Sequence, residues 1–332
     1  MKSMNPQLRT GKLIATLGTL ALATVVSTSA FAQAFPTKPI RFLMTAPAAS
    51  SIDVIGRILA DKIKDTLGQP IVVENRVGAG GTIATDAAAK AAPDGYTMVL
   101  SFNGPLAFGP HMYKALPYDP FKDLAPVIIT TSQPNLLAIN ATLPVKSVKE
   151  LIEHTRKNPG KLNYGSIGAG SSSHLSMELL KMDAGLFIVH IPFNGSPPAA
   201  ASLAAGDTQM LFSVPTALTP LIQAGKVRAL AVSGLKRYPL MPEVPTIAES
   251  GLPKFEAIAW NGVLVPAGTA RPIIDRLNRE MDNALKAADV RKRLNDAGLE
   301  PVGGTPEELA RLMRSESDKW APVIKRTGAT VD

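Results

Sequence analysis

Short apolar runs alternate with stretches of helical period from residue 40 onward. The runs at 40–44, 71–73 and 97–101 have the length expected of buried strands. Between the first two, apolar residues recur at helical spacing and stop at a glycine, Gly68; they are Ile55, Ile58, Leu59, Ile63 and Leu67. With a second helix at 83–91, this β-α-β-α-β order is typical of a parallel sheet with helices on its faces.

The same pattern restarts after residue 135. It predicts strands and helices in turn: a strand at 136–139, a helix capped by Ser147, a strand ending at Gly165, a helix at about 172–182, a strand at 187–191, a helix after Pro198, a strand at 209–212, a helix ending at Gly225 and a strand at 228–232. A second α/β unit of this size indicates a second lobe.

The C-terminal part follows a Pro-rich surface connection at 239–253. It contains an apolar strand at 260–265 and two amphipathic helices, of which the first follows Pro272. The second opens with the capping box Thr305-Pro306-Glu307-Glu308, in which the Thr and Glu308 side chains satisfy backbone N–H groups reciprocally.

The N-terminus has the layout of a secretory signal. Lys2, Arg9 and Lys12 precede an apolar run at 13–26, and small residues suited to cleavage follow by residue 34. The alternative, a membrane anchor, is disfavoured because the run is shorter than the roughly 20 residues that span a bilayer. We therefore expect residues 1–34 to be removed during export to the periplasm.

The residues after the signal exceed what one hydrophobic core usually supports. We assign residues 35–135 and 256–332 to lobe 1 and residues 136–255 to lobe 2, joined by more than one crossing strand. Two such lobes leave a cleft, and ligands of open α/β sheets bind beyond the carboxyl ends of the strands. The loops after the strands are therefore the candidate ligand-binding segments.

Composition excludes several kinds of chemistry. The net charge of +8 is spread without a basic run, which disfavours nucleic-acid binding. The chain has no cysteine, so thiol catalysis, disulfides and Cys-based zinc sites are excluded. Its four histidines lack metal-ligand spacing, and the glycines at 78–81 lack the pattern of a nucleotide loop. We expect no cofactor and no bound metal.

The first candidate loop joins the strand at 40–44 to the following helix. Its small residues Ala48, Ala49 and Ser50 would let a ligand approach the backbone N–H groups at a helix N-terminus, where an anion is favoured. Ser50 could equally be an ordinary helix cap. Asp53 fits two roles, a residue that complements the helix dipole or a contact for the amine of an amino-acid ligand.

The second candidate loop, 165–174, is rich in glycine and serine and also lies between a strand and a helix. Ser166, Gly170, Ser171 and Ser172 would supply hydroxyl and N–H donors to an oxyanion such as a carboxylate. The alternative is a flexible turn ending in a serine cap. Ser172 and His174 lack the Gly-x-Ser-x-Gly pattern and diverge on a helix, so we expect no catalytic residue.

Several motifs together resemble the Bug-type extracytoplasmic solute receptors, the substrate-binding proteins of tripartite tricarboxylate transporters. They run through the chain as PTKPI at 36–40, VENR at 73–76, GAGG at 78–81, PDGY at 93–96, YDP at 118–120, PGKLNY at 159–164, GKVRALA at 225–231 and VPT at 244–246.

The resemblance implies an α/β fold of the periplasmic binding protein type II class, with two lobes that close on a small carboxylate. By position it adds Asn103, Phe193, Asn194 and Ser213 to the ligand-binding residues. It also implies a monomer that delivers its ligand to the membrane permease subunits of the transporter. A receptor for a sensor kinase and a periplasmic serine hydrolase are the alternatives.

Two departures from the family pattern leave the ligand open. Family members usually have Pro-Phe and Gly-Gly in the first loop, where this chain has Thr45-Ala46 and Ala49-Ser50. They tend to have a lysine where this chain has Asn194. These changes alter the shape of the pocket, so a dicarboxylate, a tricarboxylate, an aromatic acid and an amino acid all remain candidates.

Overall fold

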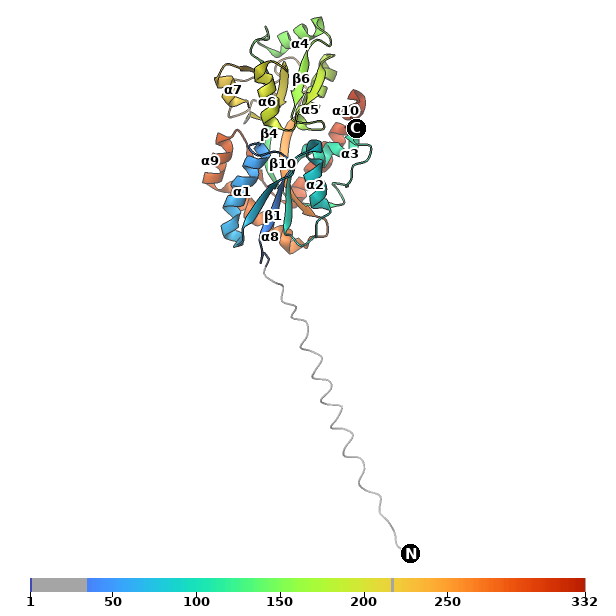
Figure 1. Ribbon diagram of the computed structural model, residues 1–332, viewed down its shortest axis with the longest axis vertical. Coiled ribbons are helices and arrows are strands. Elements are labelled where there is room, and N and C mark those ends of the chain that lie inside the picture. Colours follow the sequence, from blue (N-terminus) through green and yellow to red (C-terminus); the bar gives the residue numbers. More distant parts are fainter. Residues whose placement is uncertain (2–34, 216–217, 332) are drawn as a thin grey trace. The chain divides into compact units, whose positions relative to one another are not determined.

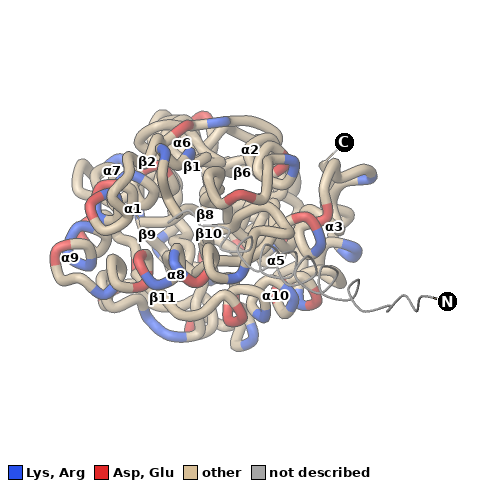
Figure 2. Tube along the Cα trace, turned by 90° about the horizontal axis from the view of Figure 1, so that it is seen from below, with Lys and Arg blue, Asp and Glu red and all other residues tan. Residues whose placement is uncertain are grey.

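The computed structural model describes Met1, residues 35–215 and residues 218–331. Apart from Met1, the predicted signal at 1–34 lies outside the described residues, so its removal stays a prediction. Within the described ranges, no helix combines the length and apolar character needed to cross a bilayer. Charged residues of both signs are interspersed along the chain, as Figure 2 shows.

The first sheet has six strands in the order β11-β4-β10-β3-β1-β2, of which Figure 1 labels β4, β10 and β1. Their bounds are β1 Ile40–Met44, β2 Ile71–Asn75, β3 Thr97–Phe102, β4 Leu124–Pro134, β10 Ile258–Pro266 and β11 Pro301–Gly303. β1 is parallel to both β2 and β3, as the sequence pattern predicts. The pairs formed by β10 and β11 are antiparallel, so the sheet is mixed rather than wholly parallel.

The helices that pack on this sheet include α1 Ser51–Leu67, α2 Thr82–Ala89, α8 Arg271–Lys286, α9 Ala288–Asp296 and α10 Pro306–Thr327. α1 contacts α8 and α9, whereas α10 contacts β4 (Figure 1). Short helices η1 Ala79–Gly81, η2 Gly104–Phe108 and α3 Gly109–Met112 lie in the connections. The C-terminal part therefore has three helices where the sequence predicted two, because α9 directly follows α8.

The second sheet has five strands in the order β7-β6-β8-β5-β9. Their bounds are β5 Leu136–Asn140, β6 Asn163–Ser166, β7 Val189–Pro192, β8 Met210–Ser213 and β9 Val227–Val232. The helices of this part are α4 Val148–Lys157, α5 Ser172–Ala184, α6 Ser196–Ala205 and α7 Thr219–Gln223. β6 is parallel to β7 and β8, whereas β5 is antiparallel to β8 and β9.

Side-chain caps fix where several helices begin. The Ser147 hydroxyl accepts a hydrogen bond from the Glu150 backbone N–H, and the Thr305–Glu308 capping box forms as predicted. α6 begins at Ser196 rather than after Pro198, because prolines fit the first helical turn, where no N–H has an intrahelical partner.

β4 and β11 were not predicted. β4 escaped the hydrophobic pattern because several of its buried side chains are polar. Thr130 Oγ donates to the Asn261 carbonyl at 3.1 Å, and Asn261 Nδ2 donates to Thr131 Oγ at 2.8 Å. Hydrogen bonds to β10 thus replace the apolar contacts that mark an ordinary buried strand.

The chain passes between the two sheets twice, from β4 to β5 and from β9 to β10. At the first passage, the Asn135 backbone N–H donates to Ser233 Oγ at 2.8 Å, and Asn135 Nδ2 donates to Ser176 Oγ at 3.1 Å. The strands of each sheet come from the ranges expected for one lobe. Residues from Lys38 onward nevertheless cluster as one unit, so the lobe boundaries stay a prediction.

Candidate functional site

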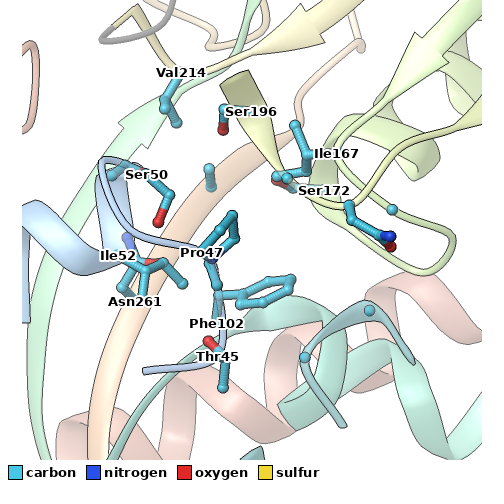
Figure 3. Close-up of a pocket in the computed structure, with 18 of the residues that line it drawn as sticks. Thr45, Pro47, Ser50, Ile52, Phe102, Ile167, Ser172, Ser196, Val214 and Asn261 are labelled. Carbon is cyan, nitrogen blue, oxygen red and sulfur yellow. The ribbon is translucent and has the colours of Figure 1, made fainter. Parts of the chain in front are cut away.

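A pocket of about 60 Å³ lies where loops from both sheets meet. The first sheet contributes the loop after β1, the segment 77–81, Phe102 and Asn103 after β3, and parts of β4 and β10. The second sheet contributes the loop after β6, the residues just before and at the start of α6, and Val214 after β8. Side chains from both sheets surround one space in Figure 3.

Three helices begin at this pocket. Ser50 precedes α1, Ser172 opens α5 and Ser196 opens α6, and all three line the pocket (Figure 3). The N-terminus of a helix carries partial positive charge on its unpaired N–H groups, so each favours a negatively charged ligand. Among the described lining residues there is no Lys, Arg or His. The helix N-termini thus bring partial positive charge to a lining whose described residues include no cationic side chain.

Serine side chains cap the N-termini of α1 and α5. The Ser50 hydroxyl accepts from the Asp53 backbone N–H, and the Ser171 hydroxyl accepts from the His174 backbone N–H. α6 has no such side-chain cap, and Pro197 and Pro198 carry no N–H. Ser196 therefore supplies the one N–H among the first three residues of α6.

Asp53 is engaged within its own loop. Its carboxylate accepts hydrogen bonds from the Ala49 backbone N–H, from Arg57 Nε and from Asn75 Nδ2, each at 3.0 Å. Burial alone would raise the pKa of Asp53, but these hydrogen bonds and the charge of Arg57 together lower it. Asp53 thus ties the first loop to α1 and β2, and it does not line the pocket.

The second loop is held by its own serines. Ser171 Oγ donates to the Gly168 carbonyl at 2.6 Å, and the Gly168 backbone N–H donates to Ser166 Oγ at 3.2 Å. Ser166 Oγ also pairs with His190 Nε2 at 2.7 Å. Gly168 and Ser172 line the pocket, whereas Ser166 and Ser171 lie behind it and shape the loop.

The described contacts do not join Ser172 to His174 as nucleophile and base. His174 Nδ1 instead accepts the Gly170 backbone N–H at 3.2 Å. Burial, followed by the charge of Lys181, lowers the pKa of His174 to about 4. Burial, followed by the neighbouring His174, lowers the pKa of His190 to about 3. Both rings are therefore neutral at pH 7.

The pocket wall includes buried polar atoms without partners in the described part of the chain. Gln133 Oε1, Gln133 Nε2 and Asn103 Oδ1 belong to lining residues that are each 1 % exposed. Asn103 Nδ2 does have a partner, the Ile258 carbonyl at 3.1 Å. The sequence analysis missed Gln133 because it did not predict β4. The sequence does show a glutamine shortly after two threonines and directly before Pro134, and this run of polar residues was the signal that could have marked it.

Aromatic side chains form much of the remaining wall, among them Phe102, Phe193 and Trp260. Trp260 Nε1 donates to Glu316 at 3.4 Å, and Trp320 Nε1 donates to the same carboxylate at 3.1 Å. Burial raises the pKa of Glu316.

The sequence analysis also missed Trp260 and Asn261 as lining residues. The sequence predicts the strand that contains them but not how close that strand lies to the candidate loops.

The structure brings five of the predicted ligand-binding residues into the lining, namely Ser50, Asn103, Ser172, Phe193 and Asn194. Seven others belong to the same loops or strand ends without lining the pocket: Ala48, Ala49, Asp53, Ser166, Gly170, Ser171 and Ser213. Ser213 Oγ is buried and lacks a partner in the described ranges. Their roles in binding stay predictions. The described residues contain no cluster of side chains able to hold a metal ion.

Residues 55–329 match the model of the tripartite tricarboxylate transporter family receptors. The chain belongs to this family. As a member of the tripartite tricarboxylate receptors it is a solute-binding protein, and the resemblance read from its motifs is confirmed. The family is of the receptor type.

Three solved structures show the same fold. The protein Rpa4515 of R. palustris with adipate is 36% identical, with a TM-score of 0.86, over 90% of this chain and 100% of that chain. The periplasmic binding protein BugD is 32% identical, with a TM-score of 0.83, over 89% and 99%. MatC of Rhodopseudomonas palustris with bound malate is 34% identical, with a TM-score of 0.82, over 87% and 100%. The expected α/β fold of periplasmic binding proteins is confirmed.

Proposed function

We propose that this receptor captures a small organic acid in the periplasm and delivers it, unaltered, to the permease subunits of a tripartite transporter. The observation that carries the proposal is the meeting of three helix N-termini, those of α1, α5 and α6, at one pocket whose described lining has no cationic side chain. Backbone N–H groups and hydroxyls then bind the carboxylate, because helix N-termini carry partial positive charge that favours an anion.

The pocket sets the size of the ligand. Its volume of about 60 Å³ fits a small molecule rather than a peptide or a polymer. The solved relatives agree with this class, since one is described with adipate and another with malate.

Three further points belong to the proposal. The segment 1–34 acts as a cleaved signal that directs the chain to the periplasm, supported by its charged and apolar regions. The receptor works as a monomer without cofactor. We also propose that it has no catalytic activity, supported by the Gly170 N–H that occupies Nδ1 of His174, the residue that would have to serve as the base for Ser172.

Calorimetry on protein stripped of ligand by unfolding and refolding tests the proposal. The panel contains dicarboxylates, tricarboxylates, aromatic acids and amino acids, with uncharged esters of the same acids as controls. We expect at least one acid to bind, and its ester to bind far more weakly, because the ester lacks the charge that the helix N-termini favour.

Tryptophan fluorescence gives a second readout. Trp260 lines the pocket and Trp320 is the other tryptophan of the chain. A fluorescence change on binding should persist in Trp320→Phe, which leaves Trp260 as the reporter. If no acid of the panel produces heat or a fluorescence change in refolded protein, the proposed function is wrong.

A further inference from the structure

A groove of about 540 Å³ lies along the edge of the second sheet. Its lining comes mainly from the start of α4, from the first residues of β9 and from the segment 241–250 that follows β9. It shares no described lining residue with the ligand pocket. The groove is therefore a separate feature of the surface, which the binding of a small acid does not use.

β9 is an outer strand of its sheet and pairs along its length with β5 alone. The Ala141 backbone N–H donates to the Lys226 carbonyl at 3.1 Å, and this bond fixes the alternation of the pair. In an antiparallel pair, every second residue turns its N–H and C=O groups away from the neighbouring strand. Val227 and Ala229 therefore direct theirs away from β5, and both residues line the groove.

The far end of this edge already carries an added extended segment. The Val232 backbone N–H donates to the Pro245 carbonyl at 2.8 Å, and the Ile247 N–H donates to the Val232 carbonyl at 3.0 Å. The described residues provide no such segment beside Val227 and Ala229. An open stretch of sheet edge is a template for an extended peptide, which pairs with it through main-chain hydrogen bonds.

The groove carries positive charge. Lys146 and Arg228 line it, and the exposed Lys226 directly precedes β9. Arg228 donates to uncharged groups, the carbonyls of Val145 at 2.7 Å and of Leu143 at 3.3 Å, and these bonds leave its charge in place. Glu243 is the one carboxylate among the described residues of the lining. Charge complementarity therefore favours an occupant with acidic side chains.

The same charges disfavour a second copy of this chain as the occupant. Two β9 edges paired about a two-fold axis would bring the lysines of one copy close to those of the other, and like charges opposite each other are destabilising. A free anion would meet the cations but would not use the N–H and C=O groups of the strand. An extended acidic peptide uses both.

We propose that the open edge of β9 docks an extended, acidic segment of a partner protein. The segment adds to the second sheet as a further strand and brings its carboxylates close to Lys146 and Lys226. The inference goes beyond the proposed function, since it concerns a surface outside the ligand pocket.

Short synthetic peptides that alternate glutamate with valine, threonine or phenylalanine are the probes, because alternate residues of a strand face the same side. Fluorescence anisotropy of the labelled peptides measures their binding to the whole receptor at low salt. We expect at least one acidic peptide to bind with a dissociation constant below about 1 mM, and to bind more weakly as salt screens the charges. Peptides with lysine in place of glutamate should not bind.

The double variant Lys146→Glu, Lys226→Glu reverses two exposed charges and keeps the hydrogen bonds of Arg228. We expect it to weaken peptide binding at least tenfold and to leave the affinity for organic acids unchanged. Lys161→Glu is the matched control, because Lys161 is also exposed but does not line the groove. It should bind the peptides as the natural protein does.

Hydrogen exchange distinguishes an added strand from attraction by charge alone. The amide hydrogens of Val227 and Ala229 should exchange at least severalfold more slowly when the peptide is bound, because it takes up their N–H groups. The Arg228 N–H faces β5 and serves as the internal reference, which should not change.

Several outcomes would overturn the proposal. Lysines beside an open edge can also serve to prevent unwanted pairing, and that role predicts that no acidic peptide binds. Binding that the double variant leaves unchanged, or binding without slower exchange at Val227 and Ala229, would contradict strand addition. Tighter binding of anionic lipid vesicles or of inorganic phosphate than of every acidic peptide would show a different kind of site. Failure of every organic acid to bind would overturn the proposed function and leave this inference standing.

Discussion

His174 and His190 stack with their ring centroids 4.0 Å apart and their planes within 7° of parallel. Both rings hold the loop that borders the pocket, His174 through the Gly170 N–H and His190 through Ser166 Oγ. Ser166 Oγ in turn accepts the N–H of Gly168, which lines the pocket. His174 and His190 do not line the pocket themselves, but through these hydrogen bonds they fix the position of the loop whose Gly168 lines it.

This arrangement predicts a loss of stability in acid. The pKa of His174 is about 4 and that of His190 about 3, both below the ordinary value of 6.5. Below about pH 6.5 the unfolded chain binds protons that the folded chain does not, so the free energy of unfolding falls as pH decreases from 6.5 toward 4. The slope is at most about 1.4 kcal/mol per pH unit for each imidazole.

Chemical denaturation at a series of pH values measures this slope. The variant His190→Gln keeps an acceptor for the Ser166 hydroxyl but does not titrate, so we expect its slope between pH 6.5 and 4 to be smaller than that of the natural protein. His154→Gln is the control for the loss of an imidazole outside the stacked pair, because His154 lies on α4. Identical slopes in all three proteins would show that the stacked pair does not govern stability in acid.

Close packing between the two sheets predicts that one added methyl group weakens ligand binding. A Cβ on Gly104 would lie 2.5 Å from the Gly170 carbonyl oxygen, which belongs to the loop of the second sheet. Gly104→Ala should therefore push the two loops apart and reduce affinity about tenfold or more. The backbone of Gly104 needs no positive φ, so strain within η2 does not explain such a loss.

Gly109→Ala is the matched control for this prediction. It lies in the adjoining helix α3, and its added Cβ would meet nothing closer than 3.5 Å. We expect its affinity, measured by calorimetry with the acid that binds most tightly, to equal that of the natural protein. Equal affinities for Gly104→Ala and the natural protein would contradict the prediction that the close approach of these two loops is needed for binding.

Asp53 supplies a third prediction, which separates its two possible roles. Because its carboxylate is bonded to Ala49, Arg57 and Asn75, Asp53→Asn should weaken all acids by a similar factor and lower the melting temperature. A direct contact with a ligand amine would give a different pattern, in which amino acids lose affinity and simple dicarboxylates keep it. Calorimetry with glutarate and glutamate distinguishes the two patterns.

The helix caps give a prediction for stability alone. The Thr305–Glu308 capping box lies at the start of α10, and neither residue lines the pocket. Thr305→Ala should lower the free energy of unfolding by about 1 kcal/mol and leave affinity unchanged. A change in affinity as large as the change in stability would contradict this prediction and would mean that the first turn of α10 affects the pocket as well as Glu316, which bonds Trp260.

The sequence predicts the parts of this fold that are governed by local patterns. β1, β2 and β3 were found because they are short apolar runs, and both candidate loops were found because small residues follow a strand. β4 was missed because its buried Thr130, Thr131 and Gln133 are polar. The two threonines pair with Asn261 on β10, a strand far away in the sequence. Gln133, a residue of the pocket lining, was missed together with this strand.

The roles within the loops could not be read from local sequence either. Asp53 is held by Asn75 from β2, and Ser166 is held by His190 from β7, so each depends on a pairing between distant strands. Composition shows that small and hydroxyl residues are present in a loop. Only the packing of the strands decides which of them line the pocket and which support it from behind.

The claim that backbone N–H groups at helix N-termini bind the carboxylate is tested most directly at Ser196. Ser196→Pro removes the one N–H among the first three residues of α6, at a position where helices tolerate proline, and Ser196→Ala removes only the hydroxyl. We expect calorimetry to show a loss of about tenfold to hundredfold for Ser196→Pro, since a hydrogen bond to a charged group contributes about 1.5–3 kcal/mol, and a much smaller loss for Ser196→Ala. Equal affinities in the natural protein and both variants would contradict the claim.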